Sequence, residues 1–313
     1  CHKVSLDVPV NRYKWLRGQD EYDAWHDSGV SLNASRTFYL PEVKRVCQDC
    51  HMPLEPAPKG DLAAKQGLVK SHRFTAVNTA LPFIRGDHET IDRIEQFVRD
   101  KKLSVDVLAL RVGERFNELV APIDRTAAMI QAGEEVQIDV VVRNRGVGHT
   151  FPGGTNDSNQ GWLEFTVADD AGNTILASGL VDESRVVDPE ARFYHAVLVD
   201  KNGKRIARRD GHNIHTAVYS RTIGPGTADI GRYRFQIPKV AAGKKLVVKA
   251  RLLWRKFDRA YTEFAYQSNP EGFKSFDDVP DLPITEIAAD SAVLQISTVG
   301  VGDVIQAVSE DWM

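Results

Sequence analysis

The sequence predicts an α+β protein with a mostly helical or irregular amino-terminal region over residues 1–100, followed by an antiparallel, immunoglobulin-like β-sandwich over residues 101–313. Three observations lead to this prediction. At 313 residues the chain is long enough for two domains. Its clearest helical pattern lies before residue 100, and its apolar residues alternate with a period of two after about residue 103.

The clearest helix is predicted over residues 87–99. Ile91, Ile94 and Val98 fall on one stripe of a 3.6-residue period, and Asp87 or Thr90 can cap the first turn. The region upstream is rich in aromatic residues, namely Trp15, Tyr22, Trp25, Phe38 and Tyr39. These aromatic side chains either surround a flat prosthetic group or pack on one another.

Short strands are predicted throughout the carboxy-terminal part. Apolar side chains alternate over 136–142, 163–167, 233–237 and 246–254, and a further strand covers 196–200. Turn residues follow two of these strands, at 170–173 and at Asn202-Gly203. Alternating strands joined by such turns favour an antiparallel sandwich.

Composition limits the class of partner. The chain has 40 Lys and Arg against 43 Asp and Glu, a net charge of −3, so nucleic acid is not an expected ligand. No apolar run reaches the roughly 18 residues of a membrane-spanning helix. The chain also begins without an apolar leader, which fits a cytoplasmic protein, a processed protein or a fragment.

Residues 47–51 read Cys-Gln-Asp-Cys-His, the pattern of covalent haem attachment. In a c-type cytochrome each thiol adds to one vinyl group of the haem. The three-residue offset places the sulfurs of Cys47 and Cys50 on one side of a helical turn. The imidazole of His51 is then carried beneath the ring, where it can bind the iron.

Two other chemistries use the same pair of cysteines. A redox dithiol normally lies between a strand and a helix, whereas Cys47 follows a loop that contains Pro41. A structural zinc site needs two further ligands at suitable spacing, and the chain has no second cysteine pair. Haem therefore fits the motif better than zinc or a redox dithiol.

The second axial ligand of the iron is predicted to be a histidine. The three methionines are poorly placed, because Met52 adjoins His51, Met129 lies in an apolar run and Met313 is terminal. A bis-histidine iron is six-coordinate and suited to electron transfer.

Five histidines are candidates for this ligand. His72 follows the motif after a flexible Pro- and Gly-containing stretch, so its loop could fold back over the haem. His149 lies in a Gly/Pro-rich loop between two predicted strands, which can direct a side chain towards a neighbouring domain. The weaker candidates are His26, His212 and His215, whereas His88 at a helix start and His195 in a strand fit structural roles better.

The first residues, Cys1-His2, match the end of a second attachment motif that has lost its first cysteine. In that interpretation the sequence is the carboxy-terminal fragment of a longer protein, with further haems upstream. The alternative is a processed chain whose amino-terminal cysteine is lipid-modified.

Several sequence motifs together resemble the bacterial multihaem c-type cytochromes of the cytochrome c554-like group. They are residues 1–3, 11–19, 22–25, 38–41, 47–53, 71–74, 78–82 and 148–154. The resemblance implies a periplasmic or cell-surface protein with closely spaced, bis-histidine haems. It assigns haem c to Cys47, Cys50 and His51, and a preceding haem to Cys1 and His2. The chain then carries at least one haem, and the full protein two or more.

The expected function is electron transfer rather than catalysis. Redox proteins and neighbouring haem domains would be the partners, in a possible homo-oligomer or membrane-associated complex. Two alternatives stay open. The chain could belong to a multihaem oxidoreductase that acts on nitrogen or sulfur oxyanions with its catalytic haem upstream, or it could be a surface-binding protein whose haem is structural.

Overall fold

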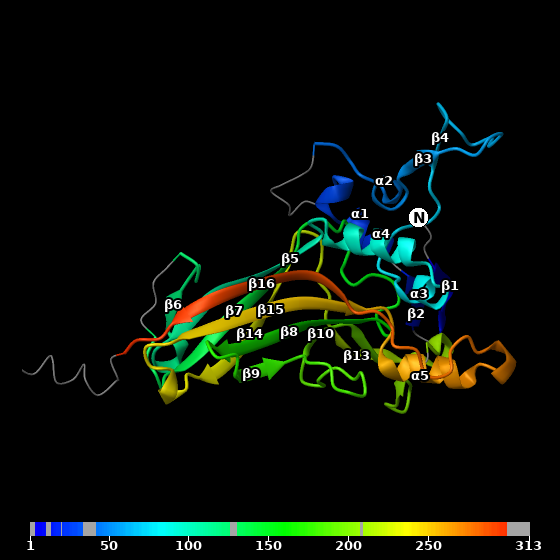
Figure 1. The fold of residues 1–313 in the computed structure, drawn as a ribbon. Coiled ribbons are helices and arrows are strands. Elements are labelled where there is room, and N and C mark those ends of the chain that lie inside the picture. The colour runs from blue at the N-terminus through cyan, green and yellow to red at the C-terminus, as the bar shows by residue number, and fades with distance from the viewer. Residues whose placement is uncertain are drawn as a thin grey trace, which may run out of the picture.

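The structure is a computed structural model. It describes residues 4–10, 14–19, 21–33, 42–125, 130–206 and 209–298. Within these residues the protein is mostly β, with 16 strands in five antiparallel sheets and five short α-helices. Figure 1 shows the long strands running side by side, with the small amino-terminal elements gathered at one end of them.

The first large sheet has the strand order β14-β7-β5-β6. Its strands are β5 (Leu103–Val112), β6 (Glu118–Val120), β7 (Glu135–Asn144) and β14 (Ala228–Gln236). The predicted alternation is confirmed in β7, where the side chains of Val136, Ile138, Val140 and Val142 are fully buried. These residues face the second large sheet.

The opposite face of β7 also carries buried side chains, and two of these, Gln137 and Asp139, are polar. Gln137 donates to Asp139 at 2.7 Å, and the Arg111 guanidinium donates to the same carboxylate at 2.9 Å. Arg234 of the neighbouring strand donates to the side-chain oxygen Oε1 of Gln137 at 2.8 Å. Each buried polar group on this face therefore has a partner, which offsets the cost of removing it from water.

The second large sheet has the strand order β10-β8-β15-β16, and β9 pairs with β8. Its strands are β8 (Gln160–Asp169), β9 (Thr174–Ser178), β10 (Arg192–Tyr194), β15 (Lys245–Arg255) and β16 (Thr285–Gln295). Leu163, Phe165 and Val167 of β8 are fully buried. They form one apolar cluster with the buried residues of β7 and β5, so the two large sheets share a core.

Three small sheets complete the β-structure. They are β1 (Val4–Val10) with β2 (Lys14–Gln19), β3 (Leu54–Pro56) with β4 (Leu68–Lys70), and β12 (Arg205–Ile206) with β11 (Ala196–Val199) and β13 (Thr216–Ser220). The Asn202-Gly203 turn joins β11 to β12, as predicted.

The α-helices are α1 (Glu21–His26), α2 (Cys47–His51), α3 (Ala80–Ile84), α4 (His88–Arg99) and α5 (Arg259–Ser268). Short 3-10 turns lie at Gly29–Ser31, Glu114–Phe116, Gly211–Asn213, Lys239–Ala241 and Glu271–Phe273. The predicted helix α4 is confirmed. Asp87 accepts a hydrogen bond from the Thr90 amide at 3.0 Å, and Ile94 and Val98 are buried.

The predicted fold class is wrong. The amino-terminal region is not a helical haem-binding unit, because residues 4–10 pair with residues 14–19 as antiparallel strands, and α1, α2 and α3 have six residues or fewer. The segment after α2 contains Pro53, Pro56 and Pro58, each of which lacks a backbone donor and stops a helix from continuing. The described chain is a mostly β protein of several antiparallel sheets rather than a helical region joined to one immunoglobulin-like sandwich.

Candidate functional site

The Cys-X-X-Cys-His segment forms the short helix α2. The Val46 amide donates to the Asp49 carboxylate at 3.0 Å, which closes the first turn. This hydrogen bond lowers the pKa of Asp49 below its usual value. Cys47 and Cys50 are three residues apart on this turn, and both are free, half-buried thiols. The helical turn expected of the motif is therefore present.

His51, the last residue of α2, is fixed by three neighbours. Its Nδ1 lies 2.7 Å from the Thr75 carbonyl oxygen. A carbonyl can only accept, so Nδ1 carries the proton and Nε2 keeps its lone pair. The ring stacks on Phe74 with centroids 4.6 Å apart and contacts Phe97 at 5.5 Å. Burial lowers the pKa of His51, although the Thr75 hydrogen bond opposes this, so the imidazole is neutral at neutral pH.

His149 lies against His51, with ring centroids 6.2 Å apart and an angle of 23° between the planes. It comes from the loop between β7 and β8, almost a hundred residues further along the chain. Its Nδ1 lies 2.9 Å from the Thr150 carbonyl oxygen, which again leaves Nε2 as the free nitrogen. Two imidazoles whose Nδ1 atoms lie against backbone carbonyls thus meet at one place.

The loop that carries His149 is anchored in the β-core. The Asn144 side chain, which is buried, donates to the His149 carbonyl oxygen at 3.0 Å. A Cβ atom at Gly146 would lie 2.7 Å from the Lys101 carbonyl oxygen, so only glycine allows this close approach. Buried Phe151 pairs with Ile223 through two backbone hydrogen bonds. These contacts fix the course of the loop on both sides of His149.

Trp254 of β15 contacts both segments that place the histidines. Its indole Nε1 donates to the Val77 carbonyl oxygen at 2.8 Å, two residues after Thr75. Its ring also packs on Phe151, two residues after His149, with centroids 5.7 Å apart. The buried indole therefore contacts both the segment that contains Thr75, through the Val77 carbonyl, and the loop that carries His149.

The other predicted site residues do not meet at this place. His72 is exposed, and the contacts with His51 in its segment come instead from Phe74 and Thr75. His26 ends α1 and pairs with its neighbour Asp27 at 3.1 Å. His212 is exposed in the 3-10 turn after β12, and His215 precedes β13. Cys1 and His2 lie outside the described residues.

Several site residues were missed by the sequence analysis: Glu21, Phe74, Thr75, Phe97 and Trp254. The Ser71–Phe74 motif was selected for His72, whereas the residues around it that contact His51 are Phe74 and Thr75. Glu21 and His149 both pack against Gly153, since a Cβ atom there would lie 3.1 Å from an atom of each. Nothing in the sequence indicates that α1 would reach this loop.

The described residues contain no group of three or more His, Cys, Asp or Glu side chains that could hold a bare metal ion. A structural zinc normally takes four protein ligands, so the geometry gives the zinc alternative no support. Haem iron differs, because the porphyrin supplies four nitrogens and the protein needs to supply only two axial ligands. A pair of imidazoles beside two free thiols fits that requirement.

Comparison with solved structures identifies a similar fold. A penta-haem cytochrome c552 from Thermochromatium tepidum aligns with a TM-score of 0.50 and 15% sequence identity, over 92% of this chain and 53% of that one. The fold resembles that of a multihaem cytochrome. This chain spans about half the length of that protein.

A second structure, the sporulation control protein Spo0M from Bacillus subtilis, aligns with a TM-score of 0.23 and 12% identity, over 66% of this chain and 55% of that one. That similarity is too low to support an argument. No protein family and no curated protein sequence matches the chain. In the part of the chain that the structure describes, no helix has the length and apolar character needed to cross a membrane.

Proposed function

We propose that this chain is an electron-transfer module of a multihaem c-type cytochrome. One haem c is attached to Cys47 and Cys50, and its iron is bound by His51 and His149. The observation that carries the proposal is the meeting of these two histidines, with ring centroids 6.2 Å apart. The haem supplies the redox chemistry, in which its iron gains and loses one electron.

The separation of the two rings suits a shared metal. A metal–imidazole bond is about 2 Å long, so two such bonds plus the distance from each nitrogen to its ring centre give about 6 Å between centroids. The backbone carbonyls of Thr75 and Thr150 hold the Nδ1 atoms, as is usual for histidines that bind a metal through Nε2. The chain thus fixes the tautomer and orientation of both ligands.

The surface around α2 supports the same proposal. Within residues 42–84 several large apolar side chains are exposed: Val43, Val46, Leu54, Leu62, Leu68, Phe74, Leu81 and Ile84. The helices of this segment are short and many of its apolar side chains are exposed. The segment therefore lacks an apolar core of its own. A flat, mostly apolar macrocycle would cover part of this surface and exclude water from the iron.

The remaining features of the proposal follow from the attachment chemistry and the similar fold. The protein works outside the cytoplasm, in the periplasm or at the cell surface, and exchanges electrons with redox proteins and neighbouring haem domains. Cys1 and His2 belong to a preceding haem. We retain the division between a haem-binding part up to residue 100 and a β-part from residue 101, with the β-part supplying His149.

The distal ligand is tested by comparing His149→Ala with His72→Ala in protein matured with haem. We expect His149→Ala to convert the low-spin optical and EPR signals to high-spin ones, because the iron loses its sixth ligand. His72→Ala is the matched control and should leave both spectra unchanged. An unaltered low-spin spectrum in the His149 variant would remove His149 from the site.

Attachment is tested separately by extracting the pigment with acidified organic solvent. Thioether-linked haem stays with the protein, whereas a double Cys47→Ser, Cys50→Ser variant should release its pigment. If the unmodified protein releases its pigment, or binds zinc and no haem, the electron-transfer proposal fails. A redox titration without reversible electron uptake would instead support the alternative in which the haem is structural.

A further inference from the structure

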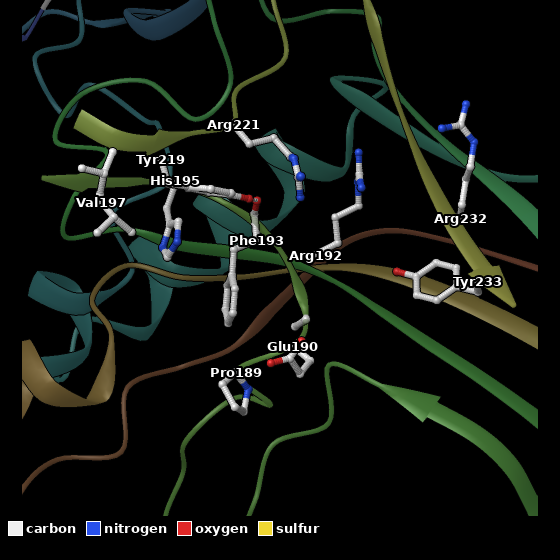
Figure 2. A pocket seen from close by; sticks show the side chains of 12 residues that line it. Pro189, Glu190, Arg192, Phe193, His195, Val197, Tyr219, Arg221, Arg232 and Tyr233 are labelled. Carbon is white, nitrogen blue, oxygen red and sulfur yellow. Dashed lines mark hydrogen bonds between the residues drawn. The ribbon is translucent and has the colours of Figure 1, made fainter.

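A second site lies on the β-part of the molecule. A pocket of about 550 Å³ opens where three edge strands come together, namely β10, β13 and β14. Figure 2 shows the side chains that line it. The pocket is formed by residues that the proposed haem site does not use, so it needs a separate explanation.

The pocket wall carries three arginines, one of which, Arg232, lies 3.9 Å from the Asp139 carboxylate. Arg192 is neutralised, because its guanidinium donates twice to Asp229 at 2.6 Å. Arg221 differs. In the part of the chain that the structure describes, its guanidinium makes no ion pair and lies over the Tyr219 ring, 5.3 Å from its centroid. The acidic residue of the lining, Glu190, is exposed and lies at the other end of the pocket from Arg221 (Figure 2).

One part of the wall beside Arg221 is aromatic and uncharged. Phe193 stacks on His195 with centroids 5.0 Å apart, and His195 meets the Tyr219 ring edge-on at 5.4 Å. Burial and the nearby charges of Arg205 and Arg221 lower the pKa of His195 to about 4, so its ring is neutral at neutral pH. A guanidinium thus borders a flat apolar surface.

The hydroxyl of Tyr233, another lining residue, is buried and has no hydrogen-bond partner, while its ring stacks on Phe165 at 3.9 Å. Buried hydroxyl groups in folded proteins are normally paired. Figure 2 shows this hydroxyl directed inward, towards the side of the pocket where Arg192 lies.

We propose that this pocket binds a small organic anion with an aromatic body. Its carboxylate or sulfonate pairs with Arg221, and its ring packs against Phe193 and Tyr219. Pockets for small molecules combine an apolar lining with a few polar groups in the same way, and a volume of about 550 Å³ falls within their usual range. The proposal does not depend on haem binding.

The test is isothermal titration calorimetry of the purified protein with benzoate, 1-naphthoate and the neutral analogue benzamide. We expect one saturable site for at least one of the two carboxylates. Benzamide should bind at least about tenfold more weakly, because it lacks the charge-assisted contact with Arg221. In the Arg221→Gln variant the two carboxylates should bind no more tightly than benzamide.

Two further variants test whether a change in ligand binding is specific to residues that line the pocket. Arg125→Gln removes an exposed arginine that lies outside the pocket and should leave binding unchanged. Val218→Glu places a negative charge at an exposed position of the lining and should weaken carboxylate binding without disturbing the core. The proposal is wrong if neither carboxylate saturates a site at concentrations up to about 10 mM. It is also wrong if Arg221→Gln and Arg125→Gln behave alike.

Discussion

At the scale of single residues, three half-buried histidines have different surroundings that determine what each can do. His51 and His149 present Nε2 because their Nδ1 atoms lie against backbone carbonyls. His195 instead lies between the rings of Phe193 and Tyr219. Residue type and spacing identified His51 because the attachment motif is local. They could not rank His149 above His72, since that choice depends on a loop brought close by the fold.

The environment of His195 predicts a loss of stability in acid. Its pKa is about 4 in the folded protein, against 6.5 for a free histidine. Between these values the unfolded chain binds more protons, so this contribution is present above pH 6.5 and is lost as the pH falls towards 4. We expect a loss of roughly 1–2 kcal/mol after allowing for partial exposure.

The measurement is urea unfolding of the unmodified protein and of His195→Gln at pH 7 and pH 4.5. The difference in the free energy of unfolding between the two pH values should be smaller in the variant. An equal pH dependence in both proteins would show that His195 is not the residue responsible.

At the scale of helices and strands, sequence patterns that act within a few residues predicted the structure correctly. Pairing between more distant segments was not predicted. The limits of α4 followed from Asp87 and the Ile94–Val98 stripe, because capping and periodicity act within a few residues. The β7 and β8 strands followed from their alternation. The amino-terminal region was misread as helical, since its aromatic residues and the attachment motif suggested a helical haem domain, whereas residues 4–10 pair with residues 14–19 as antiparallel strands.

The start of α4 gives a prediction for this element. Asp87→Ala removes the acceptor of the Thr90 amide and hydroxyl, which leaves the first turn without its cap. We expect the Tm to fall by about 2–4 °C in thermal unfolding followed by circular dichroism. Asp92→Ala is the control, because it removes an exposed aspartate from the same helix without touching the cap. Equal shifts in both variants would contradict this role for Asp87.

At the scale of the whole molecule, the site depends on a residue of the β-core. Trp254 holds the Val77 carbonyl and packs on Phe151, so a single indole connects the segments that place both histidines. The sequence predicted the strand that contains Trp254 but gave no sign of these contacts. The pocket at Arg221 was missed for a related reason: its lining comes from several strands and connecting segments that are separate in the chain and meet only in the fold.

Trp254→Phe tests this connection against a matched variant. Trp162→Phe removes an equally buried indole, whose Nε1 donates to the Gly179 carbonyl oxygen at 2.9 Å in another part of the core. Both substitutions should lower the free energy of unfolding by about 1–3 kcal/mol, because each leaves a carbonyl unpaired. Only Trp254→Phe should also alter the low-spin haem spectrum and the reduction potential. Identical spectra for the two variants would show that Trp254 does not position the ligands.

The meeting of His51 with His149 also has a mechanical consequence. An iron held by both would cross-link the polypeptide at two points 149 − 51 = 98 residues apart. Such a link restricts the unfolded chain much as a disulfide does. The prosthetic group would therefore stabilise the contact between the amino-terminal segment and the β-core. Breaking the iron–His149 bond would loosen the segment around α2 from the β-core, and proteases would then cut first around residues 57–67, between β3 and β4.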